Sequence, residues 1–265
     1  MMAKLFRKYR IRTLLKNKFS KYLLYAIGEI FLVVIGILIA LKVNNYNESL
    51  IKENTVSIYL ENFVEDLKKD QDVMRNVIIT HSFRFHSMQY LLSQVGEDIY
   101  DPTNDEIFMP EYIPSDIWAK EIPENYDREF INLAFLWTHR STTQNLNTST
   151  LDELKSIGIF SFIDNHELKT AINEYYEYWS HRLGDQNQSK FYAQIDEWES
   201  SLGQEGLFTS MFSELDDPLY VIRENNSRIY LLKKLIRESA WIVEVANGVI
   251  DFSQGLTEYI EDSYL

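Results

Sequence analysis

Residues 21–42 read KYLLYAIGEIFLVVIGILIALK, and this stretch sets the fold class of the whole chain. Between its two lysines lie twenty residues, all apolar except two tyrosines, two glycines and Glu29. An α-helix that crosses the hydrocarbon core of a bilayer needs roughly 20 such residues. We therefore expect a transmembrane helix over residues 21–43.

A cleaved signal peptide is the main alternative, because it also has a basic start and an apolar centre. Its apolar region is typically about 7 to 15 residues long and is followed by a small-x-small cleavage site. Here the apolar run continues to Val43 without such a site. The pattern favours an uncleaved signal anchor.

Charge is divided unevenly along the chain. Eight of the 26 basic residues precede Tyr22, with no acid among them, and Glu29 is the one acid of 40 that precedes Lys42. Residues 42–265 therefore hold 18 basic and 39 acidic residues, a net charge of −21. The positive-inside bias predicts a cytoplasmic N-terminus and an acidic domain on the other side of the membrane. A domain this acidic is a poor binder of nucleic acid.

Residues 1–20 are expected to form a basic cytoplasmic segment on the membrane surface. Apolar side chains alternate with the basic ones, and a basic, partly amphipathic helix binds anionic lipid headgroups. The residues expected to contact headgroups are Lys4, Arg7, Lys8, Arg10, Arg12, Lys16, Lys18 and Lys21.

The predicted span contains small residues and one acid. Gly36 and Ala40 form a small-xxx-small pair, with Gly28 near the same face, and such faces let membrane helices pack closely. Glycine and alanine are also simply common in membrane helices, so this alternative stays open. Glu29 lies about 12 Å along the helix from Lys21. A carboxylate there is costly unless protonated, reached by water or paired, so Glu29 is either a functional residue or a hydrogen-bonding contact between helices.

A heptad pattern follows the span. Its positions alternate steps of four and three, and they are Leu60, Val64, Leu67, Gln71, Met74, Ile78, His81, Phe85, Met88, Leu92 and Val95. The pattern predicts a long coiled-coil-like helix over residues 44–95 that continues the span and stops at Gly96. For Gln71 and His81, a structural role in the core is preferred over a ligand role.

The remaining chain divides into an acidic, proline-containing loop over residues 96–126 and a helical bundle over residues 127–265 that packs on the long helix. Asp127 and Asn165 are expected to cap helices, and Thr150 with Glu153 is expected to form a capping box. The last helix is predicted over about residues 222–262. Residues 159–163 are the only strand candidate, so the fold class is all-α.

Two segments resemble a known family. KYLLYAIGEIFLVVIGILIALKVNNYNE (21–48) closely resembles the N-terminal signature of a DUF6090-like family of single-span membrane proteins of unknown function from Bacteroidota, and TLDELKSIGIFSFIDNHELKTAINEYY (150–176) is similar to its central pattern. Lys42 and Tyr46 replace the usual Gln and Trp. The resemblance implies a single-pass protein of the bacterial inner membrane with a periplasmic helical domain, and it supplies no catalytic residue.

Signals of chemistry are absent from the sequence. It has no Gly-rich phosphate loop, no H-E-x-x-H and no G-x-S-x-G, the five histidines lack metal-ligand spacing, and there is no cysteine. We therefore predict no catalytic residue, no metal, no cofactor and no enzyme activity.

Three functions fit these observations. The preferred one is a scaffold or accessory subunit of a membrane complex, which oligomerises through the span and the heptad helices or joins another inner-membrane protein. The second is a periplasmic ligand-sensing module that signals through a partner. The third, resting on layout alone, is a stator-like subunit that uses Glu29 for proton coupling.

Overall fold

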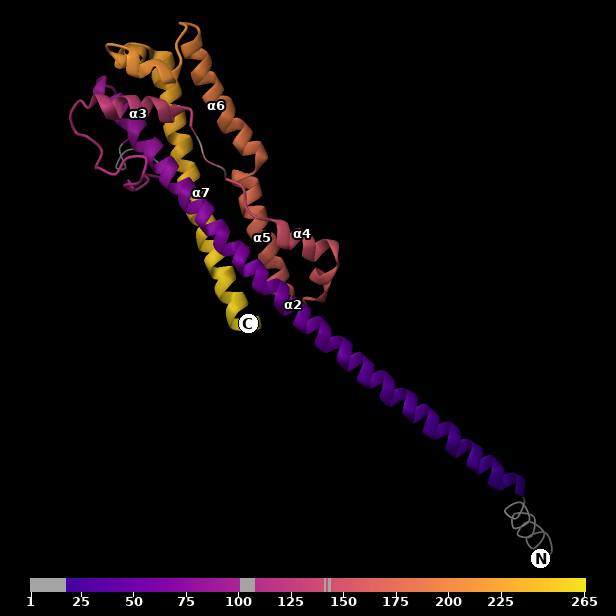
Figure 1. Cartoon of the computed structure of the whole chain (residues 1–265). Helices are drawn as coiled ribbons and strands as arrows, with labels where there is room; N and C mark the ends of the chain where they lie inside the picture. Colours follow the sequence, from indigo (N-terminus) through magenta and orange to yellow (C-terminus); the bar gives the residue numbers. More distant parts are fainter. Residues whose placement is uncertain (1–17, 101–107, 141, 143) are drawn as a thin grey trace, which may run out of the picture. The chain divides into compact units, whose positions relative to one another are not determined.

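The computed structural model describes residues 18–100, 108–140, 142 and 144–265, with side chains from Lys21 onward. The described chain is all helical, as predicted, and has no strand (Figure 1). The α-helices are α2 (Lys18–Gln94), α3 (Arg128–Thr138), α4 (Ser149–Ser156), α5 (His166–Leu183), α6 (Asp185–Gly203) and α7 (Asn226–Tyr264). The 3-10 helices are η1 (Ile159–Phe162), η2 (Thr209–Glu214) and η3 (Pro218–Val221).

The chain divides into two compact units, Met1–Val56 and Ser57–Leu265. The first unit holds the apolar run, and the second holds α3 to α7 with the C-terminal part of α2. Helix α2 runs without interruption from the apolar run to Gln94, and Gly96 follows it with a left-handed φ of +77°. The predicted long helix and its glycine stop are therefore confirmed.

In the second unit α7 lies antiparallel beside α2 (Figure 1). Gln71 Nε2 donates to Ser253 Oγ at 3.1 Å, and Ser253 Oγ donates to the carbonyl of Leu67 at 3.1 Å. Farther along α2, Lys233 Nζ lies 3.3 Å from Glu97 Oε2. The first and last long helices of this unit thus pair within one chain.

The heptad seam is filled by the chain's own helices. Its residues from Leu60 to Leu92 are buried, apart from the half-buried Ile78. The burial extends well beyond one seam, because every residue from Thr80 to Leu92 except His86 is buried. Helix α3 and the 108–126 segment cover the other sides of α2. Phe130 of α3 contacts the rings of Phe83 and Tyr90, and Tyr112 contacts the ring of His86.

Side chains set the helix starts. The predicted caps are confirmed, because Asp127 accepts from the amide of Phe130 at 3.0 Å and Asn165 accepts from that of Leu168 at 3.1 Å. Helix α7 begins at Asn226 rather than near 222, since Asn225 caps it by accepting from the amide of Arg228 at 3.1 Å.

One local prediction in the central segment, the capping box of Thr150 with Glu153, is wrong, and the strand candidate is not a strand. Thr148, not Thr150, is the N-cap residue of α4, and the hydroxyl of Thr150 donates to Asp66 on α2 instead. A long-range carboxylate therefore competes successfully with the local capping box. Residues 159–162 form the 3-10 helix η1 instead of a strand, directly after Gly158 in the left-handed conformation, with φ +79°.

Two glycines are fixed by close approach. At Gly184, between α5 and α6, an added Cβ would lie 2.3 Å from the carbonyl oxygen of Ser180. On α7, a Cβ at Gly248 would lie 2.2 Å from the hydroxyl oxygen of Tyr178, so the missing side chain leaves room for the tip of this tyrosine of α5.

Candidate functional site

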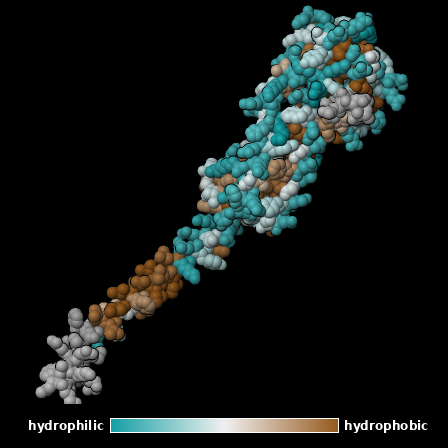
Figure 2. Space-filling model, turned by 180° about the vertical axis from the view of Figure 1, so that it is seen from behind, coloured by the Kyte–Doolittle hydropathy of each residue, from teal (hydrophilic) through white to brown (hydrophobic). Residues whose placement is uncertain are grey.

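The apolar run of α2 is fully exposed within the first unit. Every residue over 21–54 is exposed. Figure 2 shows this run as a continuous hydrophobic segment. An 18-residue window within it reaches a mean hydropathy of 2.6, so this helix is long and apolar enough to cross a membrane.

Glu29 is exposed on this apolar surface. In a helix of 3.6 residues per turn, Gly36 and Ala40 lie within about 20° of Glu29 around the axis, whereas Gly28 lies about 80° from Gly36. The face that carries the acid is therefore the Gly36/Ala40 face, and Gly28 lies at its edge. A Cβ added at Gly28 or Gly36 would meet nothing within 4 Å, so both positions are open.

A shallow hollow of about 270 Å³ lies beside Glu29 and is lined also by Ala26, Ile30, Val33 and Val34. It is apolar apart from the carboxylate. Of the basic residues expected at lipid headgroups, Lys21 is exposed. Lys4, Arg7, Lys8, Arg10, Arg12 and Lys16 lie outside the described residues, as does the side chain of Lys18.

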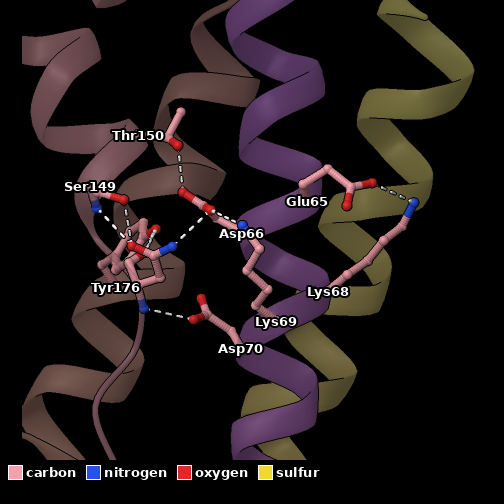
Figure 3. Close-up of polar contacts among 9 residues, drawn as sticks. Glu65, Asp66, Lys68, Lys69, Asp70, Ser149, Thr150 and Tyr176 are labelled. Atoms are coloured by element: carbon pink, nitrogen blue, oxygen red, sulfur yellow. Dashed lines mark hydrogen bonds and ion pairs between the residues drawn. The ribbon is translucent and has the colours of Figure 1, made fainter.

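Two buried aspartates on α2 bind the segment that leads into α4 (Figure 3). Asp66 accepts from the Asn147 side-chain amide at 2.8 Å and from the Thr150 hydroxyl, and Lys69 Nζ lies 3.3 Å from it. One turn later, Asp70 accepts from the backbone amide of Asn147 at 2.7 Å. We call Asp66, Asp70, Asn147 and Thr150 the aspartate clasp, and its contacts fix this segment against α2.

Asp70 carries the strongest electrostatic feature of the clasp. It is 1% exposed, and it also accepts from the hydroxyl of Tyr175 on α5 at 2.9 Å. Burial raises the pKa of Asp70 to about 6, although its two hydrogen bonds oppose the shift. Burial likewise raises the pKa of Tyr175, and the neighbouring Asp70 charge adds to it. Tyr175 is therefore a neutral donor.

A histidine and an arginine, His81 and Arg84, lie in the core about three to four turns further along α2. His81 is fully buried, and burial holds its pKa well below the usual range, with the charge of Arg84 acting in the same direction. Its Nε2 lies 3.5 Å from Gln144 Nε2, and its Nδ1 has no partner. His81 is thus a neutral core residue, which agrees with the structural role preferred from the sequence.

Arg84 is a buried cation that caps a helix end. Its guanidinium donates to the carbonyl of Thr138 at 3.0 Å and to that of Arg140, at the C-terminus of α3, where the helix dipole is negative. Its Cζ also lies 4.7 Å from the ring centre of Phe191. Burial lowers the pKa of Arg84 to about 9. The two terminal nitrogens are occupied by these contacts, whereas Nε is buried without a partner.

Thr209, His139 and Glu199 also lie together. The Thr209 hydroxyl is 2.9 Å from His139 Nδ1, and Glu199 Oε1 is 3.8 Å from the same nitrogen. A nucleophile relay needs the hydroxyl on one ring nitrogen and the carboxylate on the other. Since both groups contact Nδ1, this trio lacks the geometry of such a relay. Burial lowers the pKa of His139, so the ring is mainly neutral.

No group of three or more His, Asp or Glu side chains that could hold a metal ion occurs among the residues that the structure describes. Sequence reasoning missed the aspartate clasp and the Arg84 cap. A signal for the clasp is present, because Asp66 and Asp70 are four residues apart and each lies next to a seam position, Leu67 or Gln71. The sequence contains no comparable signal for the role of Arg84, because its partners are backbone carbonyls that lie far along the chain.

The comparisons with known proteins give one match. The model of a family of unknown function, DUF6090, matches residues 29–95, so the family resemblance seen in the sequence is confirmed over this part of the chain. The match includes Glu29, the exposed apolar face and the long helix. Neither the curated proteins nor the solved structures contain a match.

Proposed function

We propose that the chain is a non-enzymatic, membrane-anchored helical module, a scaffold or accessory subunit of the bacterial inner membrane. One observation carries the proposal: the most apolar stretch of the chain is exposed over residues 21–54, while the second unit has a closed core of its own. An exposed apolar helix of this length is unfavourable in water, whereas the hydrocarbon core of a bilayer accommodates it.

The proposed orientation places the N-terminus in the cytoplasm and the unit Ser57–Leu265 in the periplasm. Its support is the contrast between eight basic residues before Tyr22 and the net charge of −21 over residues 42–265. The resemblance to single-span proteins of Bacteroidota agrees with this orientation. Contact between the basic N-terminal residues and anionic lipid headgroups belongs to the same proposal.

A non-enzymatic role is supported by how the reactive groups are used. Asp66, Asp70 and Arg84 are buried and bound to other parts of the fold, and His81 is neutral in the core. Each therefore has a structural partner or setting that accounts for it.

Assembly, in this proposal, runs through the span rather than through the heptads. The seam is buried against the chain's own helices, so it offers no surface to a second copy. The Glu29/Gly36/Ala40 face has no partner in the described chain, and it combines small residues with a carboxylate that needs a hydrogen-bond partner in lipid. A second copy, or another inner-membrane protein, would supply it.

Because the chain has no cysteine, single-cysteine crosslinking in native membranes is a direct test. Ala40→Cys lies on the proposed face, and Leu38→Cys, about 160° away from it, is the matched control. We expect an oxidised dimer from Ala40→Cys and little from Leu38→Cys. Equal crosslinking at both positions would overturn a specific face. Crosslinks to a different protein would support the accessory-subunit form.

Glu29→Gln in the Ala40→Cys background separates the roles of the acid. If Glu29 holds helices together, the crosslink yield should fall, since the amide changes the hydrogen bonds available in lipid. An unchanged yield together with loss of a proton-dependent activity would favour the stator-like alternative. For topology, Tyr46→Cys should react with a membrane-impermeant maleimide from the periplasmic side.

A further inference from the structure

The second unit contains a cavity of about 570 Å³ at the C-terminal end of α2. One wall is the face of α2 that carries Phe85, His86 and Tyr90, and the opposite wall comes from the 108–124 segment, including Met109 and Pro110. The volume falls within the range of about 300–1,000 Å³ typical of small-molecule sites. This feature is independent of the membrane anchor.

The deep part of the cavity is aromatic and preformed. Phe85 and Tyr90 are 3% and 4% exposed, and the Tyr90 hydroxyl is held by the carbonyl of Asn125 at 2.9 Å and the amide of Asp127 at 2.8 Å. A fixed aromatic wall favours a flat apolar group, since rings stack or meet edge to face without a further ordering cost.

His86 supplies a directional acceptor. Its Nε2 lies 2.8 Å from the carbonyl oxygen of Pro110, which can only accept a hydrogen bond, so the ring hydrogen is on Nε2. Nδ1 is then left as an acceptor on a residue that lines the cavity, and the hydrogen bond of His86 to the described chain is made through Nε2. Burial lowers the pKa of His86, so the ring stays neutral near pH 7. A ligand would therefore bring the donor.

The charged residues around the cavity determine whether a cationic or an anionic ligand is preferred. Of the described residues that line it, none is Lys or Arg, and Glu124 is exposed at the rim. An anionic ligand would face this carboxylate without a compensating base, whereas a cation would be attracted to it. The aromatic rings would favour a cation as well.

We propose that this cavity binds a small aromatic amine, with the ring against Phe85 and Tyr90, the N–H group donating to His86 Nδ1, and the positive charge balanced by Glu124. Such a site would suit a ligand-sensing module, but it does not depend on whether the span forms dimers.

The test uses the full chain in nanodiscs and isothermal titration calorimetry, with empty nanodiscs as the blank. Three probes of one shape are compared near pH 7: phenethylamine as cation, 2-phenylethanol as neutral compound and phenylacetate as anion. We expect saturable binding of phenethylamine and affinity for phenylacetate weaker by about tenfold or more, because the rim carboxylate reverses its effect. Binding that is equal for all three, or indistinguishable from empty nanodiscs, overturns the proposal.

Variants locate the binding. Ser93→Trp fills the exposed mouth of the cavity and should abolish binding of all three probes. Glu124→Gln should weaken phenethylamine severalfold and leave 2-phenylethanol unchanged, while Glu121→Gln, an exposed acid of the same segment that does not line the cavity, is the matched control. If Ser93→Trp lowers the helix content, Met109→Trp replaces it. Unchanged phenethylamine affinity in a folded, mouth-filled variant would contradict the proposal.

Discussion

The two parts of α2 invert the usual relation between hydropathy and burial. Residues 21–54 contain the most apolar run of the chain and are exposed throughout, whereas residues 80–92 include Ser82, Arg84 and Ser87 and are buried almost completely. The exposed apolar surface of the first part is favourable in the hydrocarbon of a bilayer and unfavourable in water. The second part can be polar because side chains such as Ser82 and Arg84 donate to backbone carbonyls of other segments. Burial in this helix is therefore set by available partners, not by hydropathy.

The largest expected effect is the loss of membrane association when charges are placed in the apolar part of α2. Ile35→Lys combined with Leu38→Lys should remove the chain from the membrane pellet after carbonate extraction, since each central lysine costs roughly 2.5–3.5 kcal/mol of insertion free energy. Leu50→Lys with Ile51→Lys, both also exposed on α2, is the control and should leave the chain in the pellet. Retention of the first variant would mean that residues 21–43 do not anchor the protein.

In the second part, Leu60→Ala should lower the free energy of unfolding by about 2–5 kcal/mol, because it opens a cavity at a fully buried seam position. Ile58→Ala, at a residue that is 48% exposed, should cost under about 1 kcal/mol. Tryptophan fluorescence in a urea titration measures this unit alone, since all five tryptophans follow residue 57. Equal costs for both variants would contradict the closed seam.

Arg84→Met tests whether the buried arginine of the second part stabilises the fold through its hydrogen bonds to the carbonyls at the end of α3. We expect a loss of about 2–4 kcal/mol, because the carbonyls of Thr138 and Arg140 lose their donor while the volume is nearly kept. Arg75→Met removes an exposed pair with Asp72 and should change the free energy of unfolding by less than about 1 kcal/mol. A neutral Arg84→Met would mean that other donors can replace the cap.

The smallest expected effect is a pH dependence from Asp70. Its pKa is raised from 3.8 to about 6, so the folded state holds the proton more tightly than the unfolded state. The stability that Asp70 contributes is present below about pH 4 and is lost as pH rises through 6, by up to about 3 kcal/mol. The difference between wild type and Asp70→Asn, measured by urea titration from pH 4 to 7.5, should show this fall, and the exposed Asp72→Asn should not.

Much of the fold was predictable because its signals are local. The apolar run, the heptads up to Gly96 and the caps at Asp127 and Asn165 each depend on neighbouring residues, and the structure confirms the helices they predict. The errors lie where a distant partner competes with a local one. Thr150 donates to Asp66 instead of capping α4, a contact that spans 84 residues of sequence.

The candidate sites divide in the same way. Glu29 could be singled out from the sequence, because an acid within an apolar run is anomalous by itself. The cavity under the 108–124 segment could not, since that segment has no period and its distance from α2 depends on backbone contacts such as that of His86 with Pro110. To predict that site, one would need to know the backbone path of the 108–124 segment, which forms one of its walls.

The antiparallel pairing of α2 with α7 also determines when, during synthesis, the core-facing side of α2 is covered and protected from aggregation and proteolysis. Helix α2 is synthesised first and its partner last, and translation adds about 5–20 residues per second, so the core-facing side of α2 waits on the order of ten seconds for its cover. In the proposed topology the chain is tethered throughout that interval. The risk of aggregation and proteolysis is then highest before the C-terminal helix emerges, and the membrane tether keeps the unfinished chains apart from the soluble pool.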